Sequence, residues 1–239
     1  MFSWKNIIRL LEDFLSLLFP RLCQACGEHL VRNEDVVCTA CLVEIPRTGY
    51  HKIPDNDLEK NFWGRCIIER AAAYSYYRQG SKIQKLIHRL KYKGIKPVGI
   101  FLGKLYGTSL NESGFFDGID LICPVPLHRS KLRRRGFNQS AVICDGLAMV
   151  SGLLHYPDGL RRKVRTATQT RRSRIGRWQN VEGSVEVADP QIFTGKHILL
   201  VDDVITTGST IEACVNALKE IEGVRVSVVA MATVIVQSV

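Results

Sequence analysis

The segment that most constrains the fold reads ILLVDDVITTGST and covers residues 198–210. Its first four residues are all apolar, which is typical of a strand buried on both faces of a parallel sheet. Asp202 and Asp203 follow directly, and two carboxylates cannot stay charged inside a sheet without partners. We therefore predict that both acids lie just past the carboxyl end of the strand, which is where open α/β sheets bind ligands.

The residues after the two acids have the chemistry of a phosphate site. The loop residues that we expect to hold the phosphate are Thr206, Thr207, Gly208, Ser209 and Thr210. Ser209 precedes Glu212 by three residues, a capping-box pattern that predicts the start of a helix. Free backbone N–H groups at such a start favour a phosphate. Carboxylates beside a phosphate are explained if they accept hydrogen bonds from sugar hydroxyls, so the segment predicts a ribose 5-phosphate site.

The chain from Cys66 onward alternates between strand and helix patterns. Apolar runs predict strands within residues 66–77, 119–126, 192–203 and 224–236. Apolar residues at helical spacing predict helices at 81–92, 97–110, 138–150 and 210–222. This alternation, with nearly continuous apolar strands, indicates an α/β fold with a parallel sheet covered by helices on both faces.

Four of the eight cysteines are spaced as a metal site. Cys23 and Cys26 form one Cys-x2-Cys pair, and Cys38 and Cys41 form a second one eleven residues later. Two such pairs place four thiolates around one Zn²⁺ and leave no position open for substrate, so we expect a structural zinc site in a small zinc-ribbon-like module. The other four cysteines are Cys66, Cys123, Cys144 and Cys214, and their apolar surroundings predict ordinary core packing.

The N-terminal segment has the pattern of an amphipathic helix and not of a membrane span. Lys5, Arg9, Glu12 and Asp13 interrupt its apolar residues, and no small-residue cleavage site follows. Because this segment reads neither as an export signal nor as a membrane span, we expect a cytoplasmic protein, in which thiols stay reduced. We divide the chain into a helix and zinc module at residues 1–45, a polar linker at 46–65, and the α/β domain at 66–239.

The net charge of +10 is concentrated in two segments. Residues 129–135 contain five cations and no acid, and residues 161–177 contain eight cations and no acid. The remainder of the chain is therefore net negative. Such concentrated positive charge implies a polyanionic ligand or nucleic acid.

The sequence also resembles a known family. The run ILLVDDVITTGST is similar to the signature of type I phosphoribosyltransferases across all its positions. The run PVPLHRSKLRRRGFNQS at residues 124–140, the four-cysteine module, and the spaced residues of the second basic segment resemble the ComF-type competence branch of that superfamily. Those spaced residues are Arg165, Thr168, Gln169, Arg177, Asn180 and Val181. The chain departs from the pattern at Arg172, where an aliphatic residue is expected.

The resemblance implies a type I phosphoribosyltransferase fold and a ligand, phosphoribosyl pyrophosphate, bound with Mg²⁺. Its 5-phosphate would occupy the loop at 206–210, and its pyrophosphate a second loop at 124–136. Arg133, Arg134 and Arg135 are the candidates for contacting the pyrophosphate, because guanidinium forks match phosphate oxygens. Residues 161–180 are expected to form a lid, in which Arg165 and Arg177 would stabilise the departing pyrophosphate.

Two functions follow from these patterns. The first is transfer of the phosphoribosyl group to an acceptor, with a role in DNA uptake implied by the resemblance and with a DNA-uptake helicase or recombination protein as partner. Purine salvage is disfavoured, because some purine-salvage relatives carry an acid at the position of Thr206. The alternative is a non-enzymatic adaptor that binds single-stranded DNA and keeps a regulatory or vestigial phosphate site. It ranks lower, because strand binders stack bases on aromatic side chains and residues 161–180 contain only Trp178.

Overall fold

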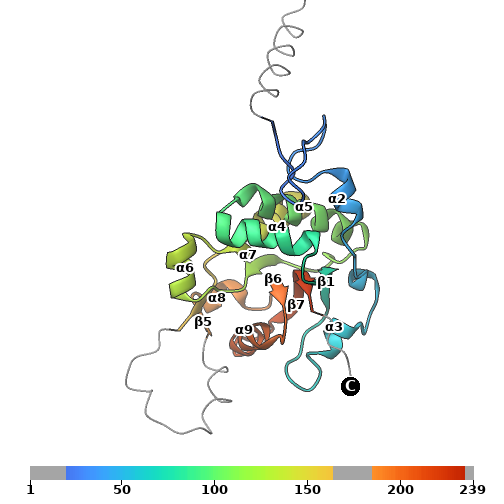
Figure 1. Ribbon diagram of the computed structural model, residues 1–239. Coiled ribbons are helices and arrows are strands. Elements are labelled where there is room, and N and C mark those ends of the chain that lie inside the picture. Colours follow the sequence, from blue (N-terminus) through green and yellow to red (C-terminus); the bar gives the residue numbers. More distant parts are fainter. Residues whose placement is uncertain (1–19, 164–184, 235–239) are drawn as a thin grey trace, which may run out of the picture.

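The computed structural model of the chain describes residues 20–163 and 185–234 (Figure 1). Its centre is a five-stranded parallel sheet in the order β1-β7-β6-β2-β3. The strands are β1 (Ala71–Tyr76), β2 (Leu121–Pro124), β3 (Leu154–His155), β6 (His197–Ile205) and β7 (Arg225–Thr233). The parallel α/β fold predicted from the sequence is confirmed.

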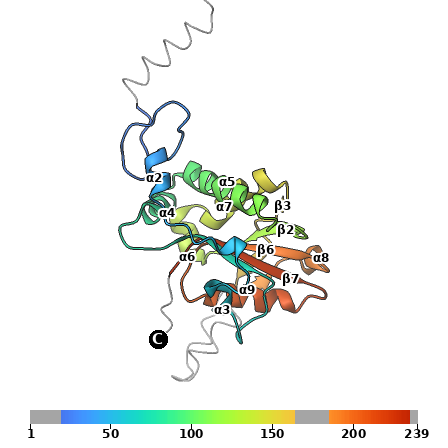
Figure 2. The same ribbon diagram turned by 90° about the vertical axis from the view of Figure 1, so that its right-hand side faces the viewer.

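Helices cover both faces of the sheet, as Figures 1 and 2 show. The helices of one face are α4 (Lys82–Lys93), α5 (Lys96–Glu112) and α7 (Gln139–Ser151), and the main helix of the other is α9 (Ser209–Lys219). Leu199 and Val201 of β6 pack in the core beneath the first group, whereas Ile198 and Leu200 pack in the core beside α9. Neighbouring residues of a strand point to opposite faces, so the unbroken apolar run at 198–201 is needed to fill two cores.

Helices α5 and α7 pack almost backbone to backbone. A Cβ atom added to Gly103 would lie 2.2 Å from the carbonyl oxygen of Ile143, and one added to Gly146 would lie 2.3 Å from that of Ile100. Only glycine at both positions permits this approach. The contact fixes α7, whose N-terminus begins at the ligand-facing edge of the sheet.

Residues 46–65, which the sequence pattern assigns to a linker, pack closely against the sheet. They contain a 3-10 helix (Tyr50–Lys52) and the short helix α3 (Asp57–Lys60). The Asn56 amide donates hydrogen bonds to the carbonyl oxygens of Tyr50, Ile53 and Ala71, and Phe62 is fully buried. The domain boundaries at residues 45 and 65 stay a prediction.

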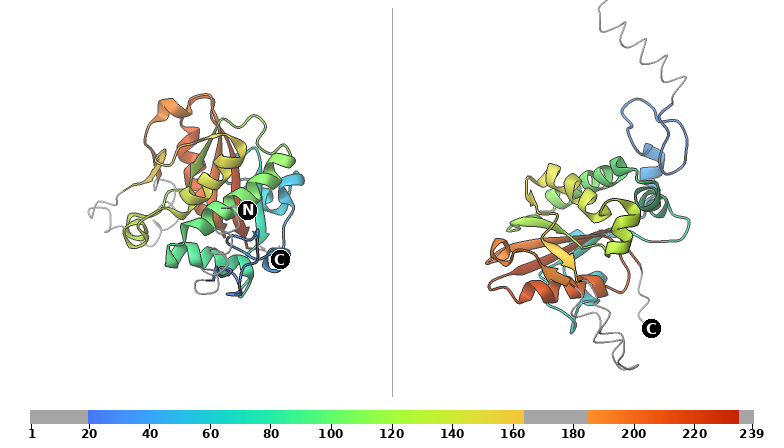
Figure 3. Two further views of the ribbon diagram at one scale, coloured as in Figure 1. Left: turned by 90° about the horizontal axis from the view of Figure 1, so that it is seen from above. Right: turned by 90° about the vertical axis from the view of Figure 1, so that its left-hand side faces the viewer.

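The N-terminal module lies above α4 and α5 in Figure 1 and in the right-hand view of Figure 3. It contains the short helix α2 (Thr39–Val43), and five of its buried apolar side chains join the core formed by α4 and α5. These are Cys23, Ala25, Val37, Cys41 and Ile45. The module is therefore packed on the α/β domain.

Several smaller elements were not expected from the sequence. Besides β3, α2, α3 and the 3-10 helix, they are the basic helix α6 (Arg129–Arg135), the antiparallel pair β4 (Leu160–Arg162) and β5 (Val185–Val187), and the short helix α8 (Pro190–Phe193). The predicted core packing of the unpaired cysteines holds for Cys123, Cys144 and Cys214, whereas Cys66 is only partly buried. Among the described residues, no helix has both the length and the apolar composition needed to cross a bilayer.

Candidate functional site

The order of the strands places a crevice between β2 and β6. These strands are neighbours, yet the chain continues from β2 to β3 on one side and from β6 to β7 on the other. Ligands of open α/β sheets bind at the carboxyl ends of the strands where the order reverses in this way. The site is therefore expected at the ends of β2 and β6.

Asp202 and Asp203 lie inside β6 and not past its end, which corrects the prediction from the sequence. β6 pairs with β7 as far as Ile205 and Thr233, whereas its pairing with β2 stops at Val201 and Pro124. The strand therefore continues with only one paired edge. Both acids lie in this half-open part, so they reach the crevice although they belong to a strand.

The two acids have different environments. The Asp203 carboxylate, whose side chain is 6% exposed, accepts a hydrogen bond from Lys91 Nζ at 2.5 Å, and Lys91 is itself largely buried. Asp202 Oδ1 accepts from Ser140 Oγ at 3.3 Å and from the backbone N–H of Asp203 at 2.8 Å. Burial, and then the charge of Asp203, raise the pKa of Asp202 to about 7, although Asp203 N–H, Lys91 and Ser140 oppose the shift. The ammonium group of Lys91 thus compensates the charge of Asp203, whereas the pKa of Asp202 is raised toward neutral pH.

A cavity of about 220 Å³ opens above the two acids. Its wall combines the acids with four cations, which are Lys91, Lys131, Arg135 and Arg162. The loop after β2 contributes residues 125–128, and the start of α7 contributes Asn138, Gln139 and Ser140. The excess of positive charge favours an anionic ligand, while the acids remain available to accept hydrogen bonds from hydroxyl groups.

A second, smaller cavity of about 40 Å³ lies in the loop between β6 and α9. All five loop residues predicted to hold a phosphate line it, and it shares Asp202, Val204 and Thr210 with the larger cavity. Arg162 Nη2 donates a hydrogen bond to Thr210 Oγ1 at 3.1 Å. The two cavities are therefore adjacent parts of one site.

The capping-box prediction for this loop is wrong. The N-cap residue of α9 is Gly208, with φ of +76° and no side-chain cap, and Ser209 is the first residue of the helix. Glu212 does not reach back to the loop backbone; it forms an ion pair with Arg65 at 2.5 Å. Arg65 also donates to the carbonyl oxygen of Thr207 at 2.8 Å. Arg65, in the segment that precedes β1, therefore stabilises the phosphate loop through these two contacts.

The predicted pyrophosphate loop contains the helix α6. Of its three predicted arginines, only Arg135 lines the cavity, whereas Arg133 and Arg134 are exposed. The Nε atom of Arg135 is buried and has no hydrogen-bond partner among the described residues. Lys131 and His128 also line the cavity, and the His128 ring caps α6 by accepting from the Ser130 N–H at 3.3 Å. Arg165 and Arg177, predicted to stabilise the leaving group, lie outside the described residues, as does the rest of segment 164–184.

Lys91 and Arg65 were not singled out from the sequence. Lys91 contacts an acid 112 residues further along the chain, and Arg65 contacts a glutamate 147 residues away. Local spacing contains no signal for either contact. Lys91 lies in the last turn of α4, a place where a lysine is ordinarily explained by the helix dipole.

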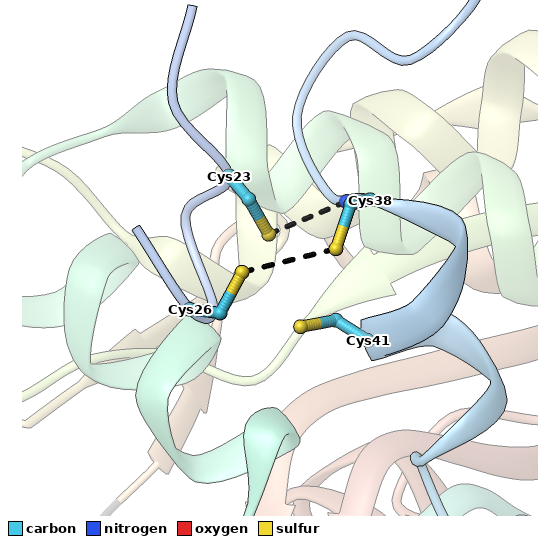
Figure 4. A group of neighbouring side chains, drawn as sticks. All are labelled: Cys23, Cys26, Cys38 and Cys41. Carbon is cyan, nitrogen blue, oxygen red and sulfur yellow. Dashed lines mark hydrogen bonds between the residues drawn. The ribbon is translucent and has the colours of Figure 1, made fainter. Parts of the chain in front are cut away.

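The four cysteines of the N-terminal module converge as predicted (Figure 4). Their sulfur atoms all lie within 4.8 Å of one another, and those of Cys26 and Cys38 are 3.8 Å apart. This separation fits two ligands of a tetrahedral zinc ion with Zn–S bonds of about 2.3 Å. Burial and the neighbouring thiols raise the pKa of Cys41 to about 12. Four thiolates at this spacing therefore need a cation, and the donor set fits Zn²⁺.

Comparison with known proteins agrees with this geometry. Residues 146–237 match the family model of the phosphoribosyl transferase domain. The chain is 29% identical over 207 residues to a protein of Salmonella typhi named DNA utilization protein YhgH, covering 82% of this chain and 89% of that protein. It is 25% identical to Competence protein F of Haemophilus influenzae, covering 83% of this chain and 91% of that protein.

Solved structures with similarity include several phosphoribosyltransferases. An allosteric regulatory enzyme of purine biosynthesis is 23% identical with a TM-score of 0.39, and the match covers 55% of this chain and 26% of that enzyme. An adenine phosphoribosyltransferase is 18% identical with a TM-score of 0.36, and the match covers 63% of this chain and 75% of the other. The match to the family model and the similarity to the named relatives, and not these structures, confirm the predicted resemblance to the ComF-type branch and to the phosphoribosyltransferase domain.

Proposed function

Because residues 146–237 match the phosphoribosyl transferase domain, we propose that the chain binds phosphoribosyl pyrophosphate and transfers its phosphoribosyl group to an acceptor. The observation that supports this most is the adjacency of the two cavities. A small phosphate-sized cavity opens into a larger cationic one, and Asp202 stands at their boundary. A pentose with a phosphate at one end and a pyrophosphate at the other matches this order of groups.

The 5-phosphate is proposed to lie in the loop at residues 206–210. The first N–H groups of α9 face this loop without intrahelical partners, and hydroxyls surround it. Thr207 Oγ1 and Ser209 Oγ lie 3.0 Å apart, so both can turn toward one phosphate. The positive φ of Gly208 sets the backbone turn that presents these groups.

The ribose hydroxyls are proposed to donate hydrogen bonds to Asp202 and Asp203. An ionised carboxylate accepts such bonds, whereas a protonated one offers fewer acceptor positions. Lys91 Nζ lies 2.5 Å from Asp203 Oδ1 and compensates the charge of this carboxylate. The acid pair would therefore hold the sugar at the centre of the cavity.

The pyrophosphate is proposed to face Lys131, Arg135 and Arg162, with Arg133, Arg134, Arg165 and Arg177 as further predicted contacts. Mg²⁺ usually binds through substrate phosphates and waters together with one or two carboxylates, and this oxygen-rich, mixed-charge cavity suits that arrangement. When bound, the ion neutralises the charge of the pyrophosphate. The cations of the chain then stabilise the negative charge that the leaving group gains as its bond to C1 breaks.

Transfer at C1 needs no nucleophile from the protein. The C1–O bond to pyrophosphate breaks with both electrons leaving on oxygen, and the acceptor supplies the electron pair for the new bond. The chain binds the sugar, orients it and stabilises the leaving group. Thr206 provides no carboxylate to assist a purine nitrogen, so purine salvage stays disfavoured.

The names of the relatives indicate a process for this activity. Because they are called DNA utilization protein and Competence protein F, we propose a role in the uptake or use of DNA. A helicase or recombination protein is then a fitting partner, and a cytoplasmic location follows from this role and from the unbridged thiols.

Titration calorimetry with phosphoribosyl pyrophosphate and Mg²⁺ tests the proposal. We expect saturable binding by the parent protein and at least about tenfold weaker binding by Asp203→Asn, because one hydrogen bond to a charged group is lost. Asp189→Asn is the matched control, since Asp189 is exposed and lies outside both cavities. Equal affinities of Asp203→Asn and this control would contradict the proposal.

A second candidate function is that of a non-enzymatic adaptor for single-stranded DNA. Helix α6 favours it, because five of its seven residues are cationic and none is buried. An adaptor predicts salt-sensitive DNA binding that survives Asp202→Asn and Asp203→Asn and falls when the cations at 129–135 are replaced. Absence of DNA binding at low salt would exclude this candidate.

A further inference from the structure

A groove of about 280 Å³ lies between the zinc module and α4, apart from the cavity above the acid pair. The zinc module contributes Gln24 and Ala25, which stand between the first two cysteines of the cluster. Helix α4 contributes the opposite wall, which is made of Gln84, Lys85, His88, Arg89, Tyr92 and Lys93. The groove therefore exists only when the module is folded and packed on α4.

The wall formed by α4 is basic throughout. The helix contains five cations and no acid. Lys82 pairs with Glu44 at 3.4 Å and Lys91 with Asp203. In contrast, Lys85, Arg89 and Lys93 are exposed and form no ion pair with any carboxylate of the described residues. These three cations are therefore available to an external anion.

An aromatic side chain stands among these cations. Tyr92 is 60% exposed although it is large and partly apolar. The His88 ring meets it edge to face at a centroid distance of 5.2 Å, and the Arg135 guanidinium lies over it at 5.3 Å. These contacts hold the ring in place while leaving much of its surface open. An exposed, braced aromatic ring beside cations is the arrangement on which unpaired bases stack.

Two cations relate the groove to the cavity above the acids, although the two share no lining residue. Arg135 contacts the Tyr92 ring and lines that cavity, and Lys91 lines it from the same helix that forms the groove. Cations of α4 and α6 therefore stand on both sides of the Tyr92 ring.

We propose that the groove between the zinc module and α4 binds single-stranded nucleic acid, with a base stacked on Tyr92 and phosphates contacting Lys85, Arg89 and Lys93. A duplex buries the faces of its bases, so only a single strand can use Tyr92 as a platform. The zinc cluster acts by fixing Gln24 and Ala25 at the opposite wall. This site is separate from the proposed phosphoribosyl site and does not require it.

Fluorescence anisotropy of a labelled oligodeoxythymidine, measured with the zinc-loaded full chain at low salt, tests the proposal. We expect about tenfold weaker binding for Tyr92→Leu, because stacking of one base is lost. Tyr92→Phe keeps the ring and is expected to bind like the parent. Lys85→Ala and Arg89→Ala are expected to weaken binding and to reduce its salt dependence, whereas Lys104→Ala, which removes an exposed cation of α5 outside the groove, should do so much less.

The proposal would be contradicted if Tyr92→Leu bound the strand as tightly as the parent, or if Lys104→Ala and Lys85→Ala lost equal strand affinity. It would also be contradicted if free dTMP competed as strongly as the same concentration of nucleotides in a strand, because this would indicate a mononucleotide site. Titration of Tyr92→Leu with phosphoribosyl pyrophosphate separates the two proposals. If Tyr92→Leu keeps its affinity for phosphoribosyl pyrophosphate but binds the strand more weakly, the two ligands have distinct sites. If the parent protein does not bind phosphoribosyl pyrophosphate but its strand binding still depends on Tyr92, the groove is supported and the proposed function is not.

Discussion

Replacing Gly208 with alanine should destabilise the fold by straining the phosphate loop. Gly208 has φ of +76°, and a Cβ atom at this position would lie 2.8 Å from Cε1 and 3.1 Å from Cζ of Phe62. Phe62 is fully buried between this loop and the sheet, so its ring has little freedom to move aside. Both the backbone conformation and the packing therefore oppose a side chain.

The two costs can be estimated separately. A residue other than glycine in the left-handed region costs about 1–2 kcal/mol. Overpacking by one carbon against a fixed ring costs about 1–3 kcal/mol. Their sum predicts that Gly208→Ala lowers the free energy of unfolding by about 2–5 kcal/mol. Binding of ribose 5-phosphate should weaken as well, because the loop that would hold the phosphate must shift.

Gly152 provides a matched control. It ends α7 with φ of +72°, and an added Cβ atom would meet nothing within 4 Å. Gly152→Ala should therefore show only the conformational cost, about 1–2 kcal/mol. Urea unfolding of both variants and the parent measures the difference. Equal destabilisation by the two substitutions would refute the conclusion that Phe62 fixes the loop.

Two further predictions concern the zinc cluster and the acid pair. Removing zinc with a chelator, or replacing Cys26 by serine, should lower the melting temperature and loosen the packing of the module on α4, because two other cysteines of the cluster, Cys23 and Cys41, pack in that core. A melting temperature unaffected by both would show that the cluster does not hold a structural metal. For Asp202, burial and Asp203 raise the pKa in the folded chain to about 7, above the value of about 3.9 for an unfolded chain, so the folded state binds this proton more tightly. Stability should then fall as the pH rises from about 4 to 7, by about 4 kcal/mol at most, and Asp202→Asn should lack this component in urea unfolding measured across that range. Identical pH profiles for variant and parent would count against the raised pKa.

The sequence by itself determined the parts of this protein that depend on short-range spacing. The apolar run at 198–201 predicts a strand between two cores, and the cysteine pairs predict the convergence of their sulfur atoms. The loop at 206–210 was predicted as a unit because hydroxyls, a glycine and a helix start follow one another directly. In each case the spacing that carries the prediction lies within a short segment of the chain, so the pattern can be read from the sequence.

Only the tertiary structure decided which distant side chains complete these local units. The contacts of Lys91 with Asp203 and of Arg65 with the phosphate loop join segments more than 100 residues apart. The extent of β6 depended on its pairing with β7, which placed the acids inside a strand that the sequence ended too early. The groove beside Tyr92 likewise arises where the zinc module meets α4. Such contacts result from the packing of whole elements, and the periodicity within any one element contains no information about them.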